Sequence, residues 1–301
     1  MISHAPVERN IPAKRPDDED FAKSLADVYA RPTPPTKPLP HESMRDVRKF
    51  TMGELQKALQ FLARNKSADT AGIALEHLLH LPHSVLQNIL DEYNVCINKG
   101  FFPKDWLHTI FTMLPKSGDA SKTSNWRPIA IQKILYKVFS KMVWLRIAFL
   151  FKAAQCKNQC AYRLGYGSDE ALHCVEYMTG FAHAFKVDLW IVSLDLSKAF
   201  DKVFHECVIE AILEQGVDEA HACLLQELYW EQTGQVGSSD WFQIFRGVKQ
   251  GDVFSPSLFN AVMEMVFKRW KIQLSVQGWQ GWKIPNIDEC FTNIRFADDV
   301  L

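Results

Sequence analysis

The stretch Leu189-Trp-Ile-Val-Ser-Leu-Asp-Leu-Ser-Lys-Ala-Phe-Asp201 decides how the rest of the sequence is interpreted. Residues 189–196 form a nearly continuous apolar run, which predicts a buried β-strand, and Asp195 is the one acid within it. Because a lone buried charge is costly, this carboxylate must be paired or must bind a cation. Asp201 is predicted to cap a helix that runs to Gln215 and closes at Gly216.

A second acidic site lies near the end of the sequence. The run Cys290-Phe-Thr-Asn-Ile-Arg-Phe-Ala297 predicts a strand that meets Asp298-Asp299, which would place two carboxylates at the tip of a hairpin. Neighbouring like charges repel unless a divalent ion neutralises them. If the hairpin packs beside the strand of Asp195, three acids converge, and carboxylate oxygens are the ligands that Mg²⁺ prefers. Taken singly, each acid is more simply a helix cap or a turn residue.

The other expected elements mix strands and helices. Thr51-Met-Gly-Glu54 reads as a capping box, in which two side chains satisfy free main-chain amides at the start of a helix. Further elements are expected as helices at about 83–99 (ending at Gly100), at 131–149, from Ser168, and from Ser255-Pro256 to about Trp270, and as a strand at 109–115. The absence of a strict β-α-β rhythm favours the α+β class.

The first part of the chain differs in composition. Residues 1–50 hold eight of the fourteen prolines amid charged residues. Such a segment cannot bury enough apolar surface to offset the entropy lost on ordering. A disordered, proline-rich leader is therefore predicted for residues 1–50.

The overall composition favours a folded intracellular protein. With 301 residues, 47% of them hydrophobic, the chain can form the core of one large domain or two small ones. Formal net charge is −1, but residues 101–160 carry ten basic against two acidic side chains, an excess of +8 that either attracts phosphates or forms a solvated helix face. The seven cysteines match no disulfide framework or zinc ribbon, and neither a signal peptide nor a membrane-spanning stretch is visible.

Four sequence blocks occur in a fixed order. They are Asn125-Trp-Arg-Pro-Ile-Ala130, Leu194-Asp-Leu-Ser-Lys-Ala-Phe-Asp-Lys-Val203, Gly247-Val-Lys-Gln-Gly-Asp-Val-Phe-Ser-Pro256 and Phe296-Ala-Asp-Asp299, with weaker matches at Asn65-Lys-Ser-Ala-Asp-Thr-Ala-Gly-Ile73, Leu114-Pro-Lys-Ser-Gly118 and Gln159-Cys-Ala-Tyr-Arg-Leu-Gly165. Together they resemble the reverse transcriptase domain, and in detail that of non-LTR (LINE-type) retrotransposons, over about residues 60–301. The resemblance implies an α+β, right-hand polymerase with fingers and palm, in which an antiparallel palm sheet packs on helices.

The resemblance also implies a role for each matching residue. Asp195 and Asp298 would be the principal ligands of two Mg²⁺ ions, with Mn²⁺ as a substitute; the Leu196 carbonyl would assist, and Asp299 would have a lesser role. Two such ions activate an attacking hydroxyl and hold a leaving pyrophosphate in line. Six residues would contact the nucleotide: Arg127 and Lys116 at the triphosphate, Phe200 as the steric gate at the sugar 2′ position, Gln250 and Gly251 beside the incoming base and sugar, and Ala297 facing the nucleotide or primer end.

The implied activity is RNA-directed DNA synthesis, in which an RNA template, a DNA primer and dNTPs are the partners and no membrane or obligate protein partner is expected. Residues 51–185 would form the fingers and 186–301 an incomplete palm, with a fingers return segment at about 217–246. Because the sequence stops two residues after Asp299, the thumb is expected to be absent and the chain to be inactive or weak by itself. The expected location is intracellular, in the nucleus for an active eukaryotic element and otherwise in the cytoplasm.

Departures from the family pattern and alternative functions stay open. Ala161 stands where the family usually has Gly, and residues 68–71 replace a Pro-Gly-rich loop, so the departures concern the fingers loops and not the metal site.

One alternative is a non-catalytic nucleic-acid-binding remnant, in which the basic 101–160 segment remains and the metal site is idle. Another is an RNA-dependent RNA polymerase, which a bulky gate at Phe200 disfavours. A group II intron or retron enzyme is a nearer relative of the LINE-type domain than an RNA-dependent RNA polymerase is.

Overall fold

The computed structural model describes residues 15–279, 281–283 and 290–301. Its α-helices are α1 (Asp18–Tyr29), α2 (Met52–Phe61), α3 (Leu75–Leu79), α4 (His83–Lys99), α5 (Lys104–Leu107), α6 (Ile134–Ala154), α7 (Ser168–Phe185), α8 (Ala199–Lys202), α9 (His205–Glu214), α10 (Glu219–Tyr229) and α11 (Ser255–Val276). Two 3₁₀ helices are η1 (His41–Asp46) and η2 (Thr123–Asn125). The strands are β1 (His108–Pro115), β2 (Trp126–Ile131), β3 (Gln232–Val236), β4 (Phe242–Ile244), β5 (Trp282–Lys283), β6 (Cys290–Phe291), β7 (Arg295–Phe296) and β8 (Asp299–Val300).

The main sheet has four strands in the order β2-β1-β3-β4. β1 pairs antiparallel with β2 and parallel with β3, while β3 and β4 are antiparallel. Parallel neighbours need a long crossover, and here the chain between β1 and β3 passes through α6 to α10 before it returns. The main sheet is therefore mixed, with an antiparallel pair at each edge, and the separate two-stranded pairs β5–β6 and β7–β8 are antiparallel as well.

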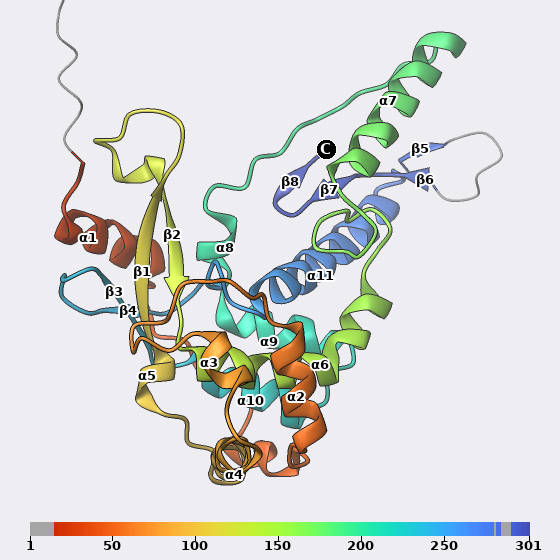
Figure 1. The fold of residues 1–301 in the computed structure, drawn as a ribbon. Helices are drawn as coiled ribbons and strands as arrows, with labels where there is room; N and C mark the ends of the chain where they lie inside the picture. Colours follow the sequence, from red (N-terminus) through yellow and green to blue (C-terminus); the bar gives the residue numbers. More distant parts are fainter. Residues whose placement is uncertain (1–14, 280, 284–289) are drawn as a thin grey trace, which may run out of the picture.

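The helices carry most of the core. Phe139 and Met142 of α6 are completely buried, as are Leu224 of α10 and, nearly so, Phe259 of α11. In Figure 1 the helices α2 to α6, α9 and α10 lie together below the sheet, and α7 with the short strands β5 to β8 lies above and to the right. The structure is thus a small mixed sheet packed on helices.

Several local predictions are confirmed. Thr51 and Glu54 form the predicted capping box of α2, and α4 ends where Gly100 adopts φ +72°. Helices also begin at Ser168 and Ser255 as predicted, although α11 extends beyond Trp270 to Val276. Among the helices of the described ranges, none combines the length and the apolar character that a membrane span requires.

The prediction of a disordered leader is wrong from residue 15 onward. Asp17 caps α1 by accepting a hydrogen bond from the Asp20 amide (2.8 Å). Phe21, Leu25 and Tyr29 form a stripe at helical spacing and are buried in a second apolar cluster with strands of the main sheet. The high proline content of residues 1–50 concealed this stripe in the sequence. Most of these prolines in fact follow the helix and do not interrupt it. Residues 1–14 of the predicted leader lie outside the described residues.

The proline-rich segment after α1 is held against the helical body by side chains. Arg31 donates to both carboxylate oxygens of Glu206 (2.8 and 2.7 Å). Lys37 pairs with Glu227 of α10 at 2.7 Å, and the Leu39 amide donates to Gln226 (2.9 Å). These contacts hold an extended segment whose prolines have no main-chain N–H to donate.

The helix predicted from Asp201 to Gln215 is divided in two. α8 and α9 are separated at Val203 and Phe204, and Asp201 lies inside α8 instead of capping it. Its buried carboxylate accepts a hydrogen bond from the Tyr29 hydroxyl (3.1 Å). The correction follows from the order of α1, because its Tyr29 supplies the partner that a buried acid requires.

The strand predicted at residues 189–196 is absent. Only Leu194 forms a β-bridge, with Val300, and Trp190 is 91% exposed. A strand needs a neighbour for its main-chain groups, and β8 comprises only Asp299 and Val300, so pairing is limited to a single bridge. In Figure 1 this segment descends from the far end of α7 to α8 as an extended chain.

An ion pair joins α2 to α6. Glu54 accepts hydrogen bonds from Nε and Nη2 of Arg146 (2.7 and 3.1 Å) and from the Thr51 amide (2.8 Å). Burial alone would raise the pKa of Glu54, but the hydrogen bonds from Arg146 and Thr51 and the charge of Arg146 outweigh it and lower this pKa from 4.5 to about 2.

We expect Glu54→Gln to lower the free energy of unfolding by about 1–2 kcal/mol at pH 7. The folded-state pKa of this carboxyl lies below its unfolded value, so its contribution is complete above pH 4.5 and is lost as the pH falls toward about 2. Urea unfolding of both proteins between pH 7 and about pH 3 measures the difference. A difference that stays constant over this range would contradict the assignment.

Candidate active site

A cleft of about 820 Å³ lies between the sheet, α1 and the loops that precede α8 and α11. Its wall includes acidic, basic and aromatic side chains from parts of the sequence that are far apart. Its lining residues from the predicted site are Lys116, Arg127, Asp195, Leu196, Phe200, Gln250, Gly251 and Asp298. The structure therefore brings eight of the ten predicted site residues to one cavity.

The other two predicted residues are not part of the lining. Ala297 is buried, and Asp299 is exposed on the other side of the same turn. In the β7–β8 hairpin, Phe296 lies opposite Asp299, so Ala297 and Asp298 form a two-residue turn. Ala297 has φ +57°, which turns its side chain away from an extended path. A direct contact between Ala297 and a nucleotide is not supported by this arrangement.

A short main-chain contact joins the two acidic segments. The Leu194 amide donates to the Val300 carbonyl (2.8 Å), and the Val300 amide donates back to Leu194 (3.4 Å). Asp195 follows the first partner, and Asp298-Asp299 precedes the second. A hairpin is therefore present beside the segment of Asp195, but the prediction is only partly confirmed. The strand is limited to Cys290–Phe291 and Arg295–Phe296, and of the two acids only Asp298 lies in the turn, because Asp299 is the first residue of β8.

The carboxylates influence one another. Partial burial raises the pKa of Asp298, and the charges of Asp299 and Asp195 raise it further, against a main-chain hydrogen bond that lowers it. Burial is the larger cause of this upward direction, and the two negative neighbours add to it. Such a site gains stability from a cation.

The donor atoms fit a divalent ion that shares its coordination with a substrate. Within the part of the chain that the structure describes, no group of three or more His, Cys, Asp or Glu side chains converges as it would around an ion held by protein alone. Mg²⁺ is usually bound by one or two carboxylates together with water and substrate phosphates, and does not need a complete protein cage. Asp195, Leu196 and Asp298 all line the cleft, and their two carboxylates and the Leu196 carbonyl are oxygen donors of this kind.

Basic side chains occupy the wall formed by the sheet. Lys116 directly follows β1, and its amide donates to the Asn125 carbonyl (2.7 Å), which closes the loop between β1 and β2. Arg127 lies on β2 opposite Leu114 of β1. Lys198 adds a third cation, whose pKa is lowered by burial although Asp201 opposes this effect. The cleft thus combines positive charge from the sheet with negative charge from the two acidic segments.

The loop at residues 247–252 forms another part of the wall. Its main chain is fixed at three points: the Gly247 amide donates to Val203 (2.7 Å), the Val248 amide donates to Phe200 (2.8 Å), and the Gln250 carbonyl accepts from the Ala130 amide (2.9 Å). Gly247 has φ +96°, and a Cβ added there would lie 2.7 Å from the Asp201 carbonyl oxygen. Glycine is therefore required for this close approach, which sets Gln250 and Gly251 at the cleft.

Aromatic rings support Phe200 at the cleft. Its ring stacks on Phe259 of α11, with centroids 4.2 Å apart and an interplanar angle of 12°. The edge of Tyr162 meets it at 6.2 Å and 77°. A ring held on two sides has one preferred position, which suits a residue that acts by excluding a substituent.

Several residues of the cleft were not predicted from the sequence. Tyr162 and Lys198 lie within sequence blocks that match the family, but the resemblance implied no role for their side chains. Asp252 is buried and accepts hydrogen bonds from the hydroxyls of Tyr136 (3.0 Å) and Tyr229 (3.4 Å). The α1 residues Phe21, Ser24 and Leu25 also line the cleft, and they could have been found only by recognising the helical stripe of α1.

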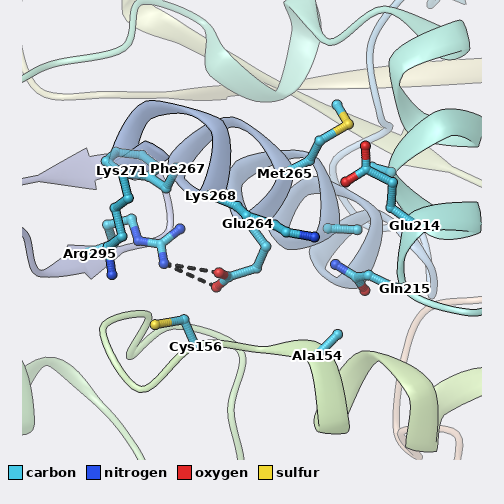
Figure 2. Close-up of a pocket in the computed structure, with 12 residues that line it drawn as sticks. Ala154, Cys156, Glu214, Gln215, Glu264, Met265, Phe267, Lys268, Lys271 and Arg295 are labelled. Atoms are coloured by element: carbon cyan, nitrogen blue, oxygen red, sulfur yellow. Dashed lines mark hydrogen bonds and ion pairs between the residues drawn. The ribbon is translucent and has the colours of Figure 1, made fainter. Parts of the chain in front are cut away.

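A smaller cavity of about 290 Å³ lies between α11, α9 and the end of α6, and Arg295 of β7 is part of its lining (Figure 2). In it, Arg295 of β7 donates from Nη2 to both oxygens of Glu264 on α11 (3.1 Å each). The guanidinium also lies 4.5 Å from the centre of the Phe267 ring. This pair fixes the strand that leads to Asp298 against the helix beneath it.

Comparison with known proteins gives a consistent relationship. Residues 114–301 match the family model of reverse transcriptase (RNA-dependent DNA polymerase). The matched region contains all four of the blocks that carry the resemblance.

Curated proteins from mobile elements are similar to the chain. The Retrovirus-related Pol polyprotein from type-1 retrotransposable element R2 of Popillia japonica is 30% identical over 208 residues, which cover 67% of this chain and 28% of that protein. The Transposon TX1 uncharacterized 149 kDa protein of Xenopus laevis is 24% identical over 262 residues, covering 84% and 19%. The RNA-directed DNA polymerase from mobile element jockey of Drosophila melanogaster is 26% identical over 188 residues, covering 60% and 20%. The chain thus spans between 19% and 28% of the length of these relatives.

Proposed function

We propose that this chain, which belongs to the reverse transcriptase (RNA-dependent DNA polymerase) family, uses the large cleft to add deoxynucleotides to a DNA primer on an RNA template. By domain type it is an RNA-directed DNA polymerase, and it is related to the polymerases of non-LTR retrotransposons. One observation carries the proposal: Asp195 and Asp298 share a single cleft with Lys116 and Arg127. A carboxylate pair beside a cationic wall suits a metal-bound triphosphate.

The proposed reaction is nucleotidyl transfer. The primer 3′-oxygen forms a bond to the α-phosphorus of a dNTP, the bond from that phosphorus to the β-phosphate oxygen breaks, pyrophosphate leaves, and the hydroxyl proton passes to water. Asp195, Asp298 and the Leu196 carbonyl would hold Mg²⁺ or Mn²⁺, and Asp299 would add negative charge from the exposed side of the turn. When bound, the divalent ions supply activation of the hydroxyl and neutralisation of the phosphate charge.

The other residues of the cleft bind and orient the nucleotide. Arg127 presents a planar guanidinium that matches phosphate oxygens, and Lys116 adds a point charge at the same wall. Gln250 and Gly251 would place main chain beside the incoming nucleotide. This main chain is packed closely on β2, where a Cβ at Gly251 would lie 3.2 Å from the Ala130 carbonyl oxygen. Phe200, held between Tyr162 and Phe259, would exclude a 2′-hydroxyl.

We assign residues 51–185, with the return segment at about 217–246, to the fingers of a right-hand polymerase, and the remainder from residue 186 to the palm. The pairing of β3 with β1 supports this division, because it joins the return segment to the sheet of the preceding unit. The β7–β8 hairpin and the α9–α11 contact support a palm in which acidic loops lie above packed helices.

Primer extension tests the function. We expect the purified chain, given an RNA template with an annealed DNA primer, to extend the primer weakly with dNTPs in Mg²⁺ or Mn²⁺, and this extension to stop when EDTA is added. NTPs should be used about 10²-fold less efficiently, because a rigid ring rejects the extra hydroxyl. Phe200→Val should narrow this ratio and leave dNTP use largely intact.

The same assay separates the two alternatives. A nucleic-acid-binding remnant would show salt-sensitive RNA binding with no extension in either divalent ion, and this result would contradict the polymerase proposal for the chain. An RNA polymerase would prefer NTPs. The basic 101–160 segment is shared by all three possibilities, so binding alone does not distinguish them.

A further inference from the structure

We propose that Gln159 is a positioning residue, which holds the Ala297-Asp298 turn in the shape that presents the Asp298 carboxylate to the cleft. This inference rests on the proposed function, and it concerns a residue that lies outside the cleft lining. Gln159 is completely buried, in the loop between α6 and α7. It is distant in sequence from the turn that it contacts.

The Gln159 amide contacts the turn at both of its polar atoms. Oε1 accepts a hydrogen bond from the Ala297 amide (3.0 Å), and Nε2 donates to the Ala297 carbonyl (3.3 Å). Oε1 also accepts from the Ala161 amide (3.0 Å), which orients the side chain from its own loop. One side chain therefore satisfies both main-chain groups of Ala297.

Ala297, the residue that Gln159 contacts, has a main-chain conformation that needs support from its surroundings. Ala297 has φ +57°, in the left-handed region that residues with a Cβ rarely adopt. Such a conformation persists when surrounding contacts determine it, and it is found at functional sites. Asp298 is the next residue, so the Ala297 conformation sets the direction in which that carboxylate leaves the main chain.

Main-chain contacts place Gln159 at the edge of the same small sheet. The Arg295 amide donates to Asn158 (2.8 Å), and the Cys160 amide donates to Arg295 (2.9 Å), which forms a parallel bridge between Gln159 and Arg295. β7 therefore has this loop on one side and β8 on the other, and β8 in turn contacts Leu194. The loop of Gln159, β7, β8 and the segment of Leu194 therefore lie side by side in this order, and their pairing holds the two acidic segments together.

Mn²⁺ binding measured by electron paramagnetic resonance tests the inference without relying on turnover. Gln159→Met keeps the length of the side chain and removes its three hydrogen bonds, and we expect Mn²⁺ to bind about 10-fold more weakly. In primer extension, kcat should fall by a similar factor, while KM for dNTP should change less, because the phosphate-binding wall is unaltered. Hydrogen exchange at residues 295–300 should become faster.

Two further variants separate positioning from a general effect on folding. Gln155→Met is the matched control, because the Gln155 amide also bonds this loop, at the Ala161 carbonyl (3.3 Å), but does not contact the turn; Mn²⁺ affinity should stay near the wild-type value. Adding Ala297→Gly to Gln159→Met should restore much of the lost affinity, since glycine adopts positive φ without support. Loss of a merely structural contact would not be repaired in this way.

Each outcome has a defined meaning. Wild-type Mn²⁺ affinity in Gln159→Met, or equal losses in Gln155→Met and Gln159→Met, would overturn the positioning role and leave the proposed function standing. If Gln159→Met fails to fold, the folded double variant takes its place, and Mn²⁺ affinity near the wild-type value in it supports the role, whereas a full loss overturns it. A wild-type chain that neither binds Mn²⁺ nor extends a primer would overturn both proposals.

Discussion

Asp298→Asn is expected to lower the rate of primer extension by about 10²–10³-fold without lowering the thermal stability of the chain. Asparagine has nearly the same shape, so the β7–β8 turn should keep its geometry. What is lost is the negative charge that attracts a divalent ion, and the amide oxygen is a weaker ligand for Mg²⁺ than a carboxylate oxygen. Asp195→Asn should have an effect of the same order.

The expected effect of Asp298→Asn on thermal stability follows from the local charges. Partial burial, and then the charges of Asp299 and Asp195, raise the pKa of Asp298, which means that the ionised form is disfavoured in the folded chain. Removing one of the three charges relieves that repulsion, so the melting temperature in the absence of metal should stay the same or rise. Loss of activity together with unchanged or higher stability is the pattern of a functional residue.

Asp188→Asn is the matched control for both acids. Asp188 is exposed in the same extended segment as Asp195 but is not part of the cleft lining. Its replacement should leave primer extension and Mn²⁺ binding within about 2-fold of the wild-type values. Primer extension and thermal unfolding of the three variants make the comparison, and full activity in Asp298→Asn would contradict the proposed role of the acid pair.

The sequence predicted best those features that depend on neighbouring residues. The capping box at Thr51, the end of α4 at Gly100 and the start of α7 at Ser168 all follow from interactions within one turn of the chain. The hairpin at Asp298 was predicted for the same reason. Eight of the predicted site residues share one cleft because the resemblance carries information about tertiary contacts that local patterns lack.

The failed predictions all depend on contacts between distant residues. The apolar run at 189–196 satisfies every local requirement of a strand, yet a strand also needs partners, and Leu194 alone finds one. Asp201 was predicted to cap a helix because no buried partner for it was recognised. That partner is Tyr29, which belongs to the proline-rich segment that was predicted to be disordered. Gln159 carries no local sign of its contact with Ala297, which follows 138 residues later in the sequence, after helices α7 to α11.

Burial of the Arg295–Glu264 pair leads to the largest expected effect on stability. Arg295 is among the largest fully buried side chains, with 1% exposure, and Glu264 is 13% exposed. Within the described residues, Nε and Nη1 of Arg295 have no hydrogen-bond partner, so Glu264 is the group that compensates this charge (Figure 2). A buried charge that loses its partner retains its full desolvation cost.

Glu264→Ala is therefore expected to lower the free energy of unfolding by about 3–5 kcal/mol. The double variant Glu264→Leu with Arg295→Met should recover most of this loss, because apolar side chains of similar size remove both buried charges and pack against Phe267. Equilibrium urea unfolding followed by circular dichroism measures all three free energies. Because Arg295 also begins β7, primer extension by the double variant tests whether packing alone keeps the hairpin in place.

The Glu210–Arg269 pair provides the control, because it joins the same chemical groups at the surface. Arg269 donates to Glu210 at 2.7 Å, but both side chains are about half exposed. Arg269 also pairs with Glu214, and water and this second acid replace Glu210 when it is lost, so Glu210→Ala should change the free energy of unfolding far less than Glu264→Ala does. Equal changes in the two variants would mean that water reaches Arg295 in solution. In that case the position of the hairpin would have to depend on the contacts of Gln159 and Leu194 alone.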